Sequence, residues 1–204
     1  MGDWREVNYP VMERFFTVQG EGAFTGASAW FIRLGGCDVG CAWCDVKESW
    51  DAEAHPKIDA GTLVNEAVES GAPICVITGG EPAMHDLTSL TKGLQSVGLR
   101  THIETSGTHA LTGDWDWVTF SPKRFKAPLD AIYDQSHELK VVVVNRHDLK
   151  WGEEHALRMP PEAVCYFQPE WDRREKVLPH IMEHLRIRPN WRISLQTHKY
   201  LGLP

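Results

Sequence analysis

Short apolar runs alternate along the chain with helical patterns, and this order constrains the fold more than any other feature of the sequence. Runs dense in Val, Ile, Phe and Trp predict buried strands at 29–34, 73–78, 100–105, 117–120, 138–144, 163–167 and 191–195. Apolar residues at spacings of three and four predict helices within 60–68, 87–97 and 177–185, the last beginning or kinking at Pro179. We therefore predict an α/β fold: a partial (β/α) TIM-like barrel with about six parallel core strands and reduced helices, in a single domain over residues 1–204.

Unusual polar clusters come directly after these predicted strands. They lie at 35–44, 78–82, 104–107, 121–123, 168–169 and 196–198. In (β/α) barrels the loops at the carboxyl ends of the strands build the active site, so these clusters converge in space under this fold. Each cluster alone is also typical of an ordinary turn, because Gly, Pro and Ser are common in loops. The joint pattern predicts a functional site at the carboxyl end of the sheet.

The charge and hydropathy of the chain exclude several classes of function. The formal net charge of −7 disfavours a protein that binds a nucleic-acid backbone, and it suits a small polar substrate. No run approaches the roughly 18 apolar residues of a membrane span, and the first residues lack the pattern of a signal peptide. We therefore expect a cytoplasmic protein without membrane or direct nucleic-acid contact.

Three of the five cysteines, Cys37, Cys41 and Cys44, lie within eight residues in a C-x3-C-x2-C arrangement. A disulfide framework would spread an even number of cysteines over the chain, so a metal site is the better interpretation. Three thiolates hold three corners of a 4Fe-4S cluster and leave one iron open, whereas clusters that only transfer electrons usually have four cysteine ligands. Cys75 and Cys165 lie in apolar runs and are expected to be buried core thiols.

This motif resembles that of the radical S-adenosylmethionine (SAM) superfamily, which has an aromatic residue where Trp43 stands. The segment Thr-Gly-Gly-Glu-Pro at 78–82 is similar to the GGEP motif of the same superfamily, which meets the amino and carboxylate ends of SAM. The resemblance implies a 4Fe-4S cluster whose open iron binds SAM, and electron transfer that cleaves SAM to a 5'-deoxyadenosyl radical. It also implies that Trp43 lies near the adenine; the alternative is a tryptophan that only packs.

Beyond these motifs, the chain resembles the 7-carboxy-7-deazaguanine synthase family over nearly its whole length. The resemblance rests on Phe-Phe-Thr-Val-Gln-Gly-Glu-Gly at 15–22, which is similar to the family's substrate loop, on Arg33, and on the segments 103–107, 121–123 and 196–204. It implies a lyase that converts 6-carboxy-5,6,7,8-tetrahydropterin to 7-carboxy-7-deazaguanine by hydrogen abstraction at C6, ring contraction and loss of ammonia, on the path to queuosine in tRNA. It further implies a homodimer and a reductant such as flavodoxin or ferredoxin.

The same resemblance implies which residues bind the two small molecules. Arg33 offers a bidentate guanidinium to the pterin carboxylate, and Gln19 pairs with donors and acceptors of the ring. An exposed ion pair for Arg33 and a plain turn at 19–20 are the alternatives. No catalytic side chain is expected beyond the cluster and SAM. The implied substrate residues are Val18, Gln19, Gly20, Arg33, Thr78 and the free carboxylate of Pro204, and the implied SAM residues are Trp43, Gly80, Glu81, Ser121, Pro122, Lys123, Gln168 and Glu170.

One position departs from the family pattern and concerns magnesium. Magnesium-dependent members carry Thr or Ser after the Cys-Asp pair, whereas here Cys44 and Asp45 are followed by Val46, which has no oxygen to ligate Mg2+. The sequence therefore predicts a weaker dependence on Mg2+, with the ammonium of Lys47 sharing the neutralisation of the substrate's charge. The alternatives are a solvent-exposed Lys47 and an Mg2+ ion held by the substrate, Asp45 and waters.

Three other functions remain open on the sequence. A Cys3His zinc site would draw its fourth ligand from His85, His102, His109 or His198. A glycyl-radical enzyme activating protein has similar cysteine spacing and size, although the motifs at 19–22 and 196–199 argue against it. A non-enzymatic metal-binding or RNA-associated module is disfavoured by the acidic net charge. Turnover of the pterin distinguishes the synthase from all three.

Overall fold

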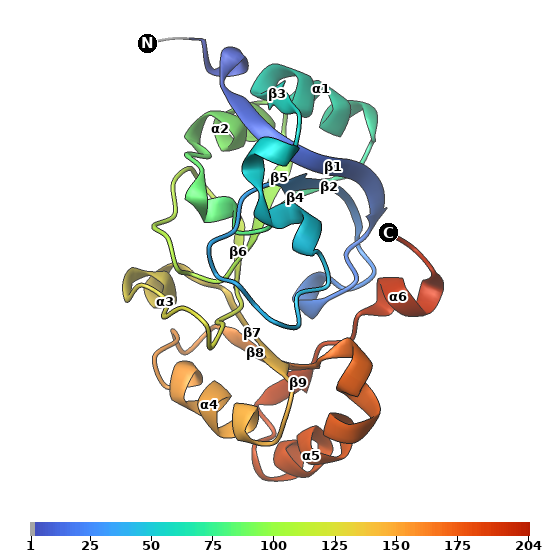
Figure 1. The fold of residues 1–204 in the computed structure, drawn as a ribbon, viewed down its shortest axis with the longest axis vertical. Coiled ribbons are helices and arrows are strands. Elements are labelled where there is room, and N and C mark those ends of the chain that lie inside the picture. Colours follow the sequence, from blue (N-terminus) through green and yellow to red (C-terminus); the bar gives the residue numbers. More distant parts are fainter. Residues whose placement is uncertain (1–2) are drawn as a thin grey trace.

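The computed structural model describes residues 3–204, so the first two residues of the domain predicted over 1–204 lie outside it. Within that part of the chain, nine strands form one sheet in the order β3-β1-β2-β4-β5-β6-β7-β8-β9 (Figure 1). The strands from β2 across to β9 run parallel, and β1 pairs antiparallel with β2 and β3. The strands are β1 (Asn8–Val18), β2 (Ser28–Leu34), β3 (Lys57–Asp59), β4 (Ile74–Gly79), β5 (Arg100–Thr105), β6 (Trp117–Phe120), β7 (Glu138–Val143), β8 (Val164–Pro169) and β9 (Trp191–Ile193).

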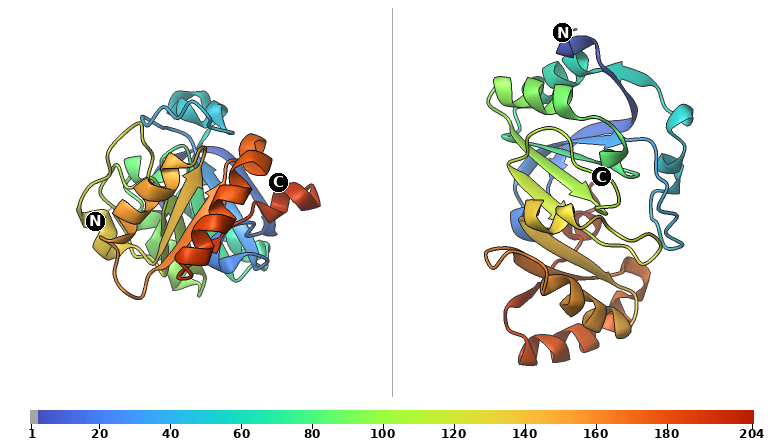
Figure 2. Two further views of the ribbon diagram at one scale, coloured as in Figure 1. Left: turned by 90° about the horizontal axis from the view of Figure 1, so that it is seen from below. Right: turned by 90° about the vertical axis from the view of Figure 1, so that its left-hand side faces the viewer.

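Helices connect the strands, and α1 and α2 lie at one end of the sheet with α4 and α5 at the other (Figures 1 and 2). Asp59 caps the start of α1, because its carboxylate accepts a hydrogen bond from Thr62 N at 2.8 Å. Among the described residues, no helix is both long enough and apolar enough to cross a membrane. The helices are α1 (Ala60–Glu69), α2 (Thr88–Ser96), α3 (Ala131–Gln135), α4 (His147–Ala156), α5 (Arg174–Ile187) and α6 (Thr197–Leu201), and short 3-10 turns include η3 (Lys47–Trp50), η5 (Pro82–Met84) and η6 (Trp171–Arg173).

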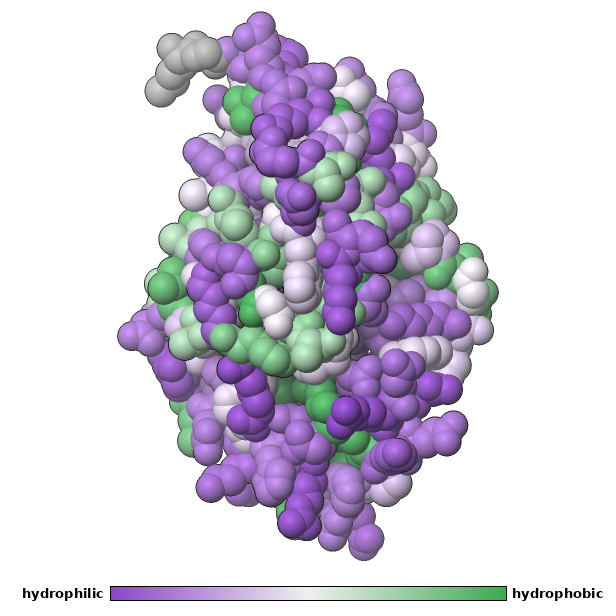
Figure 3. Space-filling model, in the orientation of Figure 1, coloured by the Kyte–Doolittle hydropathy of each residue, from purple (hydrophilic) through white to green (hydrophobic). Residues whose placement is uncertain are grey.

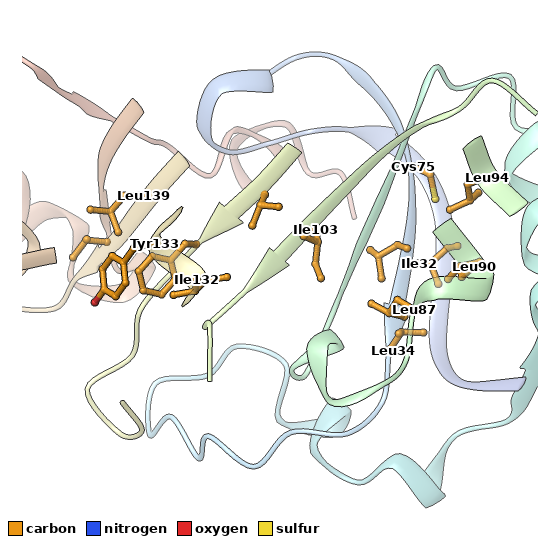
Figure 4. Close-up of a cluster of buried hydrophobic side chains, with 14 of the residues drawn as sticks. Ile32, Leu34, Cys75, Leu87, Leu90, Leu94, Ile103, Ile132, Tyr133 and Leu139 are labelled. Atoms are coloured by element: carbon orange, nitrogen blue, oxygen red, sulfur yellow. The ribbon is translucent and has the colours of Figure 1, made fainter. Parts of the chain in front are cut away.

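The main hydrophobic core fills the space between the helices and one face of the sheet. Ile32 and Leu34 of β2 lie beside Leu90 and Leu94 of α2 (Figure 4). Alternate residues of a strand face opposite sides of a sheet, so these apolar side chains share one face. Their neighbours along the same strands, such as Arg33, therefore face the other side. Burial of this face stabilises the fold by about 25 cal/mol for each Å² of apolar surface removed from water.

The opposite face of the sheet, called here the inner face, changes from apolar to polar along the strands. Near the amino ends, Phe31, Ile74 and Val76 pack against Phe15 and Phe24 in a second, smaller core. Near the carboxyl ends, the same face carries the polar side chains Arg33, Thr78, Glu104, Lys140 and Gln168, which line a cavity. The smaller core closes one end of the inner face, so that a binding site remains at the carboxyl ends only.

The structure confirms the α/β fold with a mostly parallel sheet, and it corrects two details of the elements. The sheet is open, and its seven parallel strands are those that the seven apolar runs predict, including the short β9. Residues 15–18 of the predicted substrate loop belong to β1, so the loop itself starts at Gln19. The helix predicted to begin or kink at Pro179 begins at Arg174 and continues through that residue, with Val177 and Ile181 buried on either side of it.

Two buried histidines predict how the stability of the protein depends on pH. Burial lowers the pKa of His102 to about 4, and it lowers the pKa of His155, which bonds the Tyr133 hydroxyl at 2.6 Å, to the same value. Both are neutral in the folded protein, whereas the unfolded chain protonates them below about pH 6.5. The free energy of unfolding is therefore highest above pH 6.5 and falls as the pH is lowered towards 4, by about 1.4 kcal/mol per pH unit for each histidine.

Urea unfolding at pH 7, 6 and 5 measures this slope. His102→Leu, which places a side chain of similar size among Phe24 and Trp117, is expected to remove about half of it. His180→Gln is the control, because that histidine is exposed. An unchanged slope in His102→Leu would show that His102 takes up its proton equally in the folded and unfolded states.

Candidate active site

A cavity of about 300 Å³ opens at the carboxyl ends of the parallel strands. The cysteine loop, residues 36–46, borders it and crosses the front of the sheet in light blue in Figure 1. Across the middle of this face apolar side chains gather between two hydrophilic ends (Figure 3). All six polar clusters that follow the predicted strands contribute lining residues, so these clusters converge in space as the fold predicts. Predicted site residues in the lining are Val18, Gln19, Gly20, Arg33, Cys37, Cys41, Trp43, Cys44, Val46, Thr78, Gly80, Glu81, Ser121, Lys123, Gln168, Glu170 and Pro204, whereas Pro122 is not among them.

Cys37, Cys41 and Cys44 are free thiols that border the cavity together. Burial raises the pKa of Cys41 to about 11 and also raises that of Cys37. These thiols therefore become thiolates when a positive metal centre binds to them. Residues 3–204 contain no group of three or more His, Cys, Asp or Glu side chains arranged to hold a single metal ion. The donor set, three thiols on one loop, has the chemistry that an iron-sulfur cluster requires.

The start of the cysteine loop is held by contacts of two successive residues. Cys37 N donates to Trp50 O at 3.1 Å, which joins the loop to η3. The next residue, Asp38, accepts from Lys126 at 2.5 Å and contacts His109 at 3.1 Å. The hydrogen bond from Lys126, with a smaller contribution from His109, lowers the pKa of Asp38. The loop is therefore held in place by the protein itself, which limits the entropy lost when the thiols bind a cluster.

The Thr-Gly-Gly-Glu-Pro segment ends β4 against the start of the cysteine loop. Gly80 N donates to Leu34 O at 3.0 Å, and Glu81 N donates to Gly36 O at 2.8 Å. A Cβ on Gly80 would overlap Gly36 O and would lie 2.7 Å from the Cβ of Cys37. Gly79 has a φ of +148°, and a Cβ there would overlap Leu34 O. Glycine is required at both positions, because the two backbone segments approach more closely than a side chain allows.

Glu81 is buried, and its carboxylate binds the neighbouring strand end. Thr105 Oγ1 donates to Oε1 at 2.6 Å, and Ser106 N and its hydroxyl both donate to Oε2, the backbone bond at 2.7 Å. Ala83 N completes the set at 3.1 Å and caps η5. The Glu81 side chain therefore joins the carboxyl ends of β4 and β5, and both oxygens of its carboxylate have protein partners.

Lys123 and Trp43 form the wall of the cavity beside the cysteines. The Lys123 ammonium donates to Ser121 O at 2.9 Å and to Ser121 Oγ at 2.6 Å, and it lies 5.7 Å from the centre of the Trp43 ring. Burial lowers the pKa of Lys123, and the nearby Cys41 opposes this shift. An anion that binds in this part of the cavity would therefore be attracted to the ammonium.

The loop after β1 and the C-terminal segment close another side of the cavity. Thr197 donates to Gly20 O through its backbone N at 2.9 Å and through its hydroxyl at 3.0 Å. His198 lies where a Cβ of Gly20 would be, so glycine is needed here for close packing. The Thr17 hydroxyl donates to Pro204 O at 3.5 Å, and Pro204 lines the cavity, so the end of the chain lies at the cavity.

Arg33 lies on the inner face of β2 and is mostly buried. Its Nε donates to Glu13 Oε1 at 2.6 Å across the β1–β2 pair. Arg33 lines the cavity, and its contact with Glu13 uses Nε, so this bond does not involve the two Nη atoms. The ion pair fixes the plane of the guanidinium, which is the group best suited to a carboxylate.

The residues around Val46 do not form a magnesium site. Val46 lines the cavity without an oxygen, and Asp45 Oδ2 accepts a hydrogen bond from Lys199 at 2.8 Å. Lys47 is not among the lining residues, and its ammonium lies 6.0 Å from the centre of the Trp50 ring. The hydroxyl ligand is missing and the nearest carboxylate is already paired with a cation, so the residues present do not fit Mg2+.

Sequence analysis assigned no role to several charged residues that line the cavity. Lys140 is the clearest example, because its ammonium lies between Glu21 and Glu104 in the wall of the cavity. The signal in the sequence is a lysine inside the apolar run of β7, at a position that shares the inner face with Val142. The other unassigned charged or amide residues of the lining are Glu21, Glu104, Asp172, Gln196 and Lys199.

Comparison with known proteins identifies the class of this site. The model of the radical SAM superfamily matches residues 31–133, which include the cysteine loop and the Gly-Gly-Glu turn. This match covers half of the chain, so the fold and the site are those of a radical SAM enzyme.

Relatives at full length identify the family within that class. A 7-carboxy-7-deazaguanine synthase of Flavobacterium psychrophilum is 49% identical over 96% of this chain and 92% of the relative, and one of Synechocystis is 49% identical over 97% and 94%. The crystal structure of QueE from Escherichia coli has a TM-score of 0.84 at 34% identity, and the match covers 96% of this chain and 97% of that one. The chain belongs to the 7-carboxy-7-deazaguanine synthase family.

A substitution in the glycine turn is expected to impair cluster binding although the three cysteines stay unchanged. In Gly80→Ala the new Cβ pushes against Gly36 and Cys37, at a cost of about 1 to 3 kcal/mol for overpacking. Because the strain falls on the first cysteine, we expect less iron and sulfide per chain after anaerobic reconstitution. Gly61→Ala is the control, since its Cβ comes no closer than 3.2 Å to any neighbour. Equal iron content in Gly80→Ala and the wild type would contradict this reading of the turn.

Proposed function

We propose that this enzyme converts 6-carboxy-5,6,7,8-tetrahydropterin to 7-carboxy-7-deazaguanine and ammonia, on the path to queuosine. The product differs from the substrate by one molecule of ammonia, so the reaction balances without a net oxidant or reductant. Its overall result is the cleavage of a carbon–nitrogen bond and the contraction of a ring. This makes the enzyme a carbon–nitrogen lyase, in agreement with its family.

The observation that carries this proposal is the convergence of three groups on one cavity. The cysteine thiols lie on one wall, Arg33 and Gln19 lie on another, and the Gly-Gly-Glu turn joins the two. A cluster held by the cysteines and a substrate held at the Arg33 side would therefore share one cavity. Enclosure matters, because a reactive radical must be kept from water and from other partners.

Cys37, Cys41 and Cys44 would hold the 4Fe-4S cluster in the proposed site. When bound, the cluster and SAM supply an organic radical that takes a hydrogen atom from C6 of the pterin and later returns it. The ammonium of Lys123 and the ring of Trp43 line the same wall and offer a cation and an aromatic face to SAM. Further proposed SAM contacts are Gly80, Glu81, Ser121, Pro122, Gln168 and Glu170; Pro122 would act through its position in the chain, since it is not in the lining.

The pterin would bind between Arg33 and the loop after β1. The Nη pair of Arg33 suits the carboxylate of the substrate, and the amide of Gln19 suits the ring. Thr78 lies on β4 next to Arg33 in the register of the sheet, so its hydroxyl faces the same region. Backbone groups of Val18 and Gly20 and the terminal carboxylate of Pro204 complete the proposed set.

The contact between Lys199 and Asp45 supports a role for Lys199, in place of Lys47, in neutralising the charge of the substrate. Lys199 lies in α6, binds Asp45 next to the last cysteine, and lies 5.3 Å from the centre of the Trp171 ring. It lines the cavity, whereas Lys47 does not. An ammonium at this position neutralises negative charge without the octahedral oxygen geometry that Mg2+ demands.

Three further features are proposed on family resemblance. The enzyme would act as a homodimer in the cytoplasm, and it would receive electrons from a flavodoxin or a ferredoxin. A glycyl-radical enzyme activating protein would instead need an open surface for a large protein substrate. The closed side formed by Gly20, Thr197 and His198 supports a small molecule as the substrate.

The decisive test of the proposed function is anaerobic reconstitution followed by turnover of the pterin with SAM. We expect Cys37→Ala, Cys41→Ala and Cys44→Ala each to lose both the iron-sulfur absorbance and the activity, because each removes one of the three thiolate ligands. Cys75→Ala is the control, since that thiol lies in the core away from the cavity. A wild-type enzyme with a full cluster and no turnover of the pterin would overturn the proposed reaction.

The response to magnesium tests the proposed role of Lys199. Turnover is expected to change less than about twofold when Mg2+ is added to metal-stripped enzyme, because Val46 supplies no ligand. Lys199→Gln is expected to lower kcat/KM for the pterin by about tenfold, in the range of a lost charge-assisted contact, whereas Lys47→Gln leaves it unchanged. A steep rise with Mg2+ from near zero would remove Lys199 from this role.

A further inference from the structure

Lys140 has no role in the chemistry described so far, although it is among the most buried charges in the chain. Its side chain is 4% exposed and projects from the inner face of β7. The ammonium donates to Glu104 Oε2 at 2.8 Å and to Glu21 Oε2. Burying an ion pair costs several kcal/mol of solvation for each ion, so a group of this kind is weak evidence for stability alone.

The two carboxylates pass the influence of Lys140 to both segments that close the cavity. Glu104 Oε1 accepts from the Gln19 amide at 3.0 Å, and Glu21 Oε1 accepts from the Gln196 amide at 2.9 Å. Lys140 is thereby linked through Glu104 to Gln19 in the loop after β1. Through Glu21 it is also linked to Gln196 in the C-terminal segment. All five side chains line the cavity.

The same contacts fix which way the Gln19 amide is turned. Its Nε2 donates to Glu104, and its Oε1 accepts from Glu21 N at 3.0 Å. Exchange of the amide nitrogen and oxygen would place two donors against each other and two acceptors against each other. Within the described chain, this leaves one N–H and one lone pair of the amide for a ligand. A donor beside an acceptor is the pattern that pairs with a ring amide.

The charges of the group agree with this geometry. Desolvation lowers the pKa of Lys140, but the two carboxylates outweigh it, so the net shift is upward. Desolvation raises the pKa of Glu104, and Lys140 outweighs it, so the net shift is downward. Lys140 and Glu104 are therefore ionised at neutral pH, and removal of the ammonium would leave two partly buried carboxylates, those of Glu104 and Glu21, without the cation that they share.

We infer that Lys140 is a positioning residue that sets the orientation of Gln19 and so the affinity of the enzyme for the ring of its substrate. The inference rests on the proposed function for the identity of that ring. It assigns no chemical step to Lys140, which acts through Glu104 and Glu21. The two carboxylates that the Lys140 ammonium bonds are not among the proposed SAM contacts.

Steady-state kinetics of Lys140→Met test the inference. We expect the pterin KM to rise about tenfold or more, while SAM cleavage without pterin changes less than about twofold. Lys92→Met, an exposed lysine on α2, is the control and should match the wild type. Lys140→Met with Glu21→Gln removes one of the two opposed carboxylates and should recover part of the affinity. An unchanged pterin KM in a folded Lys140→Met enzyme overturns the inference, as does an equal loss for pterin and SAM.

Amide hydrogen exchange provides a second readout that needs no turnover. The Glu21 N–H is bonded to the Gln19 side chain, so its exchange rate reports the orientation of that amide. Exchange at Glu21 should be at least about tenfold faster in Lys140→Met and unchanged in Lys92→Met. If Lys140→Met does not fold, Lys140→Arg, which keeps the charge but moves it, should show an intermediate rate. Inactive wild-type enzyme would overturn the proposed function, whereas unchanged exchange at Glu21 would overturn the role of Lys140.

Discussion

The close approach of the ends of β2 and β4 is the constraint on which the site depends. Gly80 N bonds Leu34 O, and Glu81 N bonds Gly36 O, so the start of the cysteine loop is an extension of the sheet. No side chain fits between these backbones, and for that reason two glycines follow Thr78. Because the buried Glu81 carboxylate then joins the turn to the end of β5, the thiols, the turn and the inner face are placed by one continuous set of hydrogen bonds.

The inner face shows how a parallel sheet keeps polar side chains where a reaction needs them. Parallel sheets are usually covered by apolar groups on both faces, and here the amino-terminal half of the inner face obeys that rule with Phe31 and Val76. In the carboxyl-terminal half, Glu104 and Lys140 replace apolar side chains and neutralise one another. Their solvation cost is offset by burial on the opposite face, where Ile103, Leu139 and Val141 belong to the main core.

The sequence was sufficient to predict the fold class, the seven parallel strands and the convergence of the polar clusters on one cavity, because these depend on local apolar patterns and on the order of elements. It was insufficient for β1, in which Pro10 and the charged pair at 13–14 interrupt the alternation that marks a strand. The sequence also could not predict contacts between distant segments. The pairing of Asp45 with Lys199, 154 residues later, depends on where α6 packs, and no local pattern reports that.

The cations that line the cavity differ in the charge of their hydrogen-bond partners. Arg33, Lys140 and Lys199 each bind a carboxylate of the protein, whereas Lys123 bonds only the neutral oxygens of Ser121 among the hydrogen bonds of residues 3–204. Burial without a carboxylate lowers the pKa of Lys123, so this ammonium gains most from an anion that enters the site. It lies beside the cysteines, where metal binding converts thiols to thiolates. A chain with a net charge of −7 thereby places beside its three cysteines an ammonium whose hydrogen bonds go to neutral oxygens.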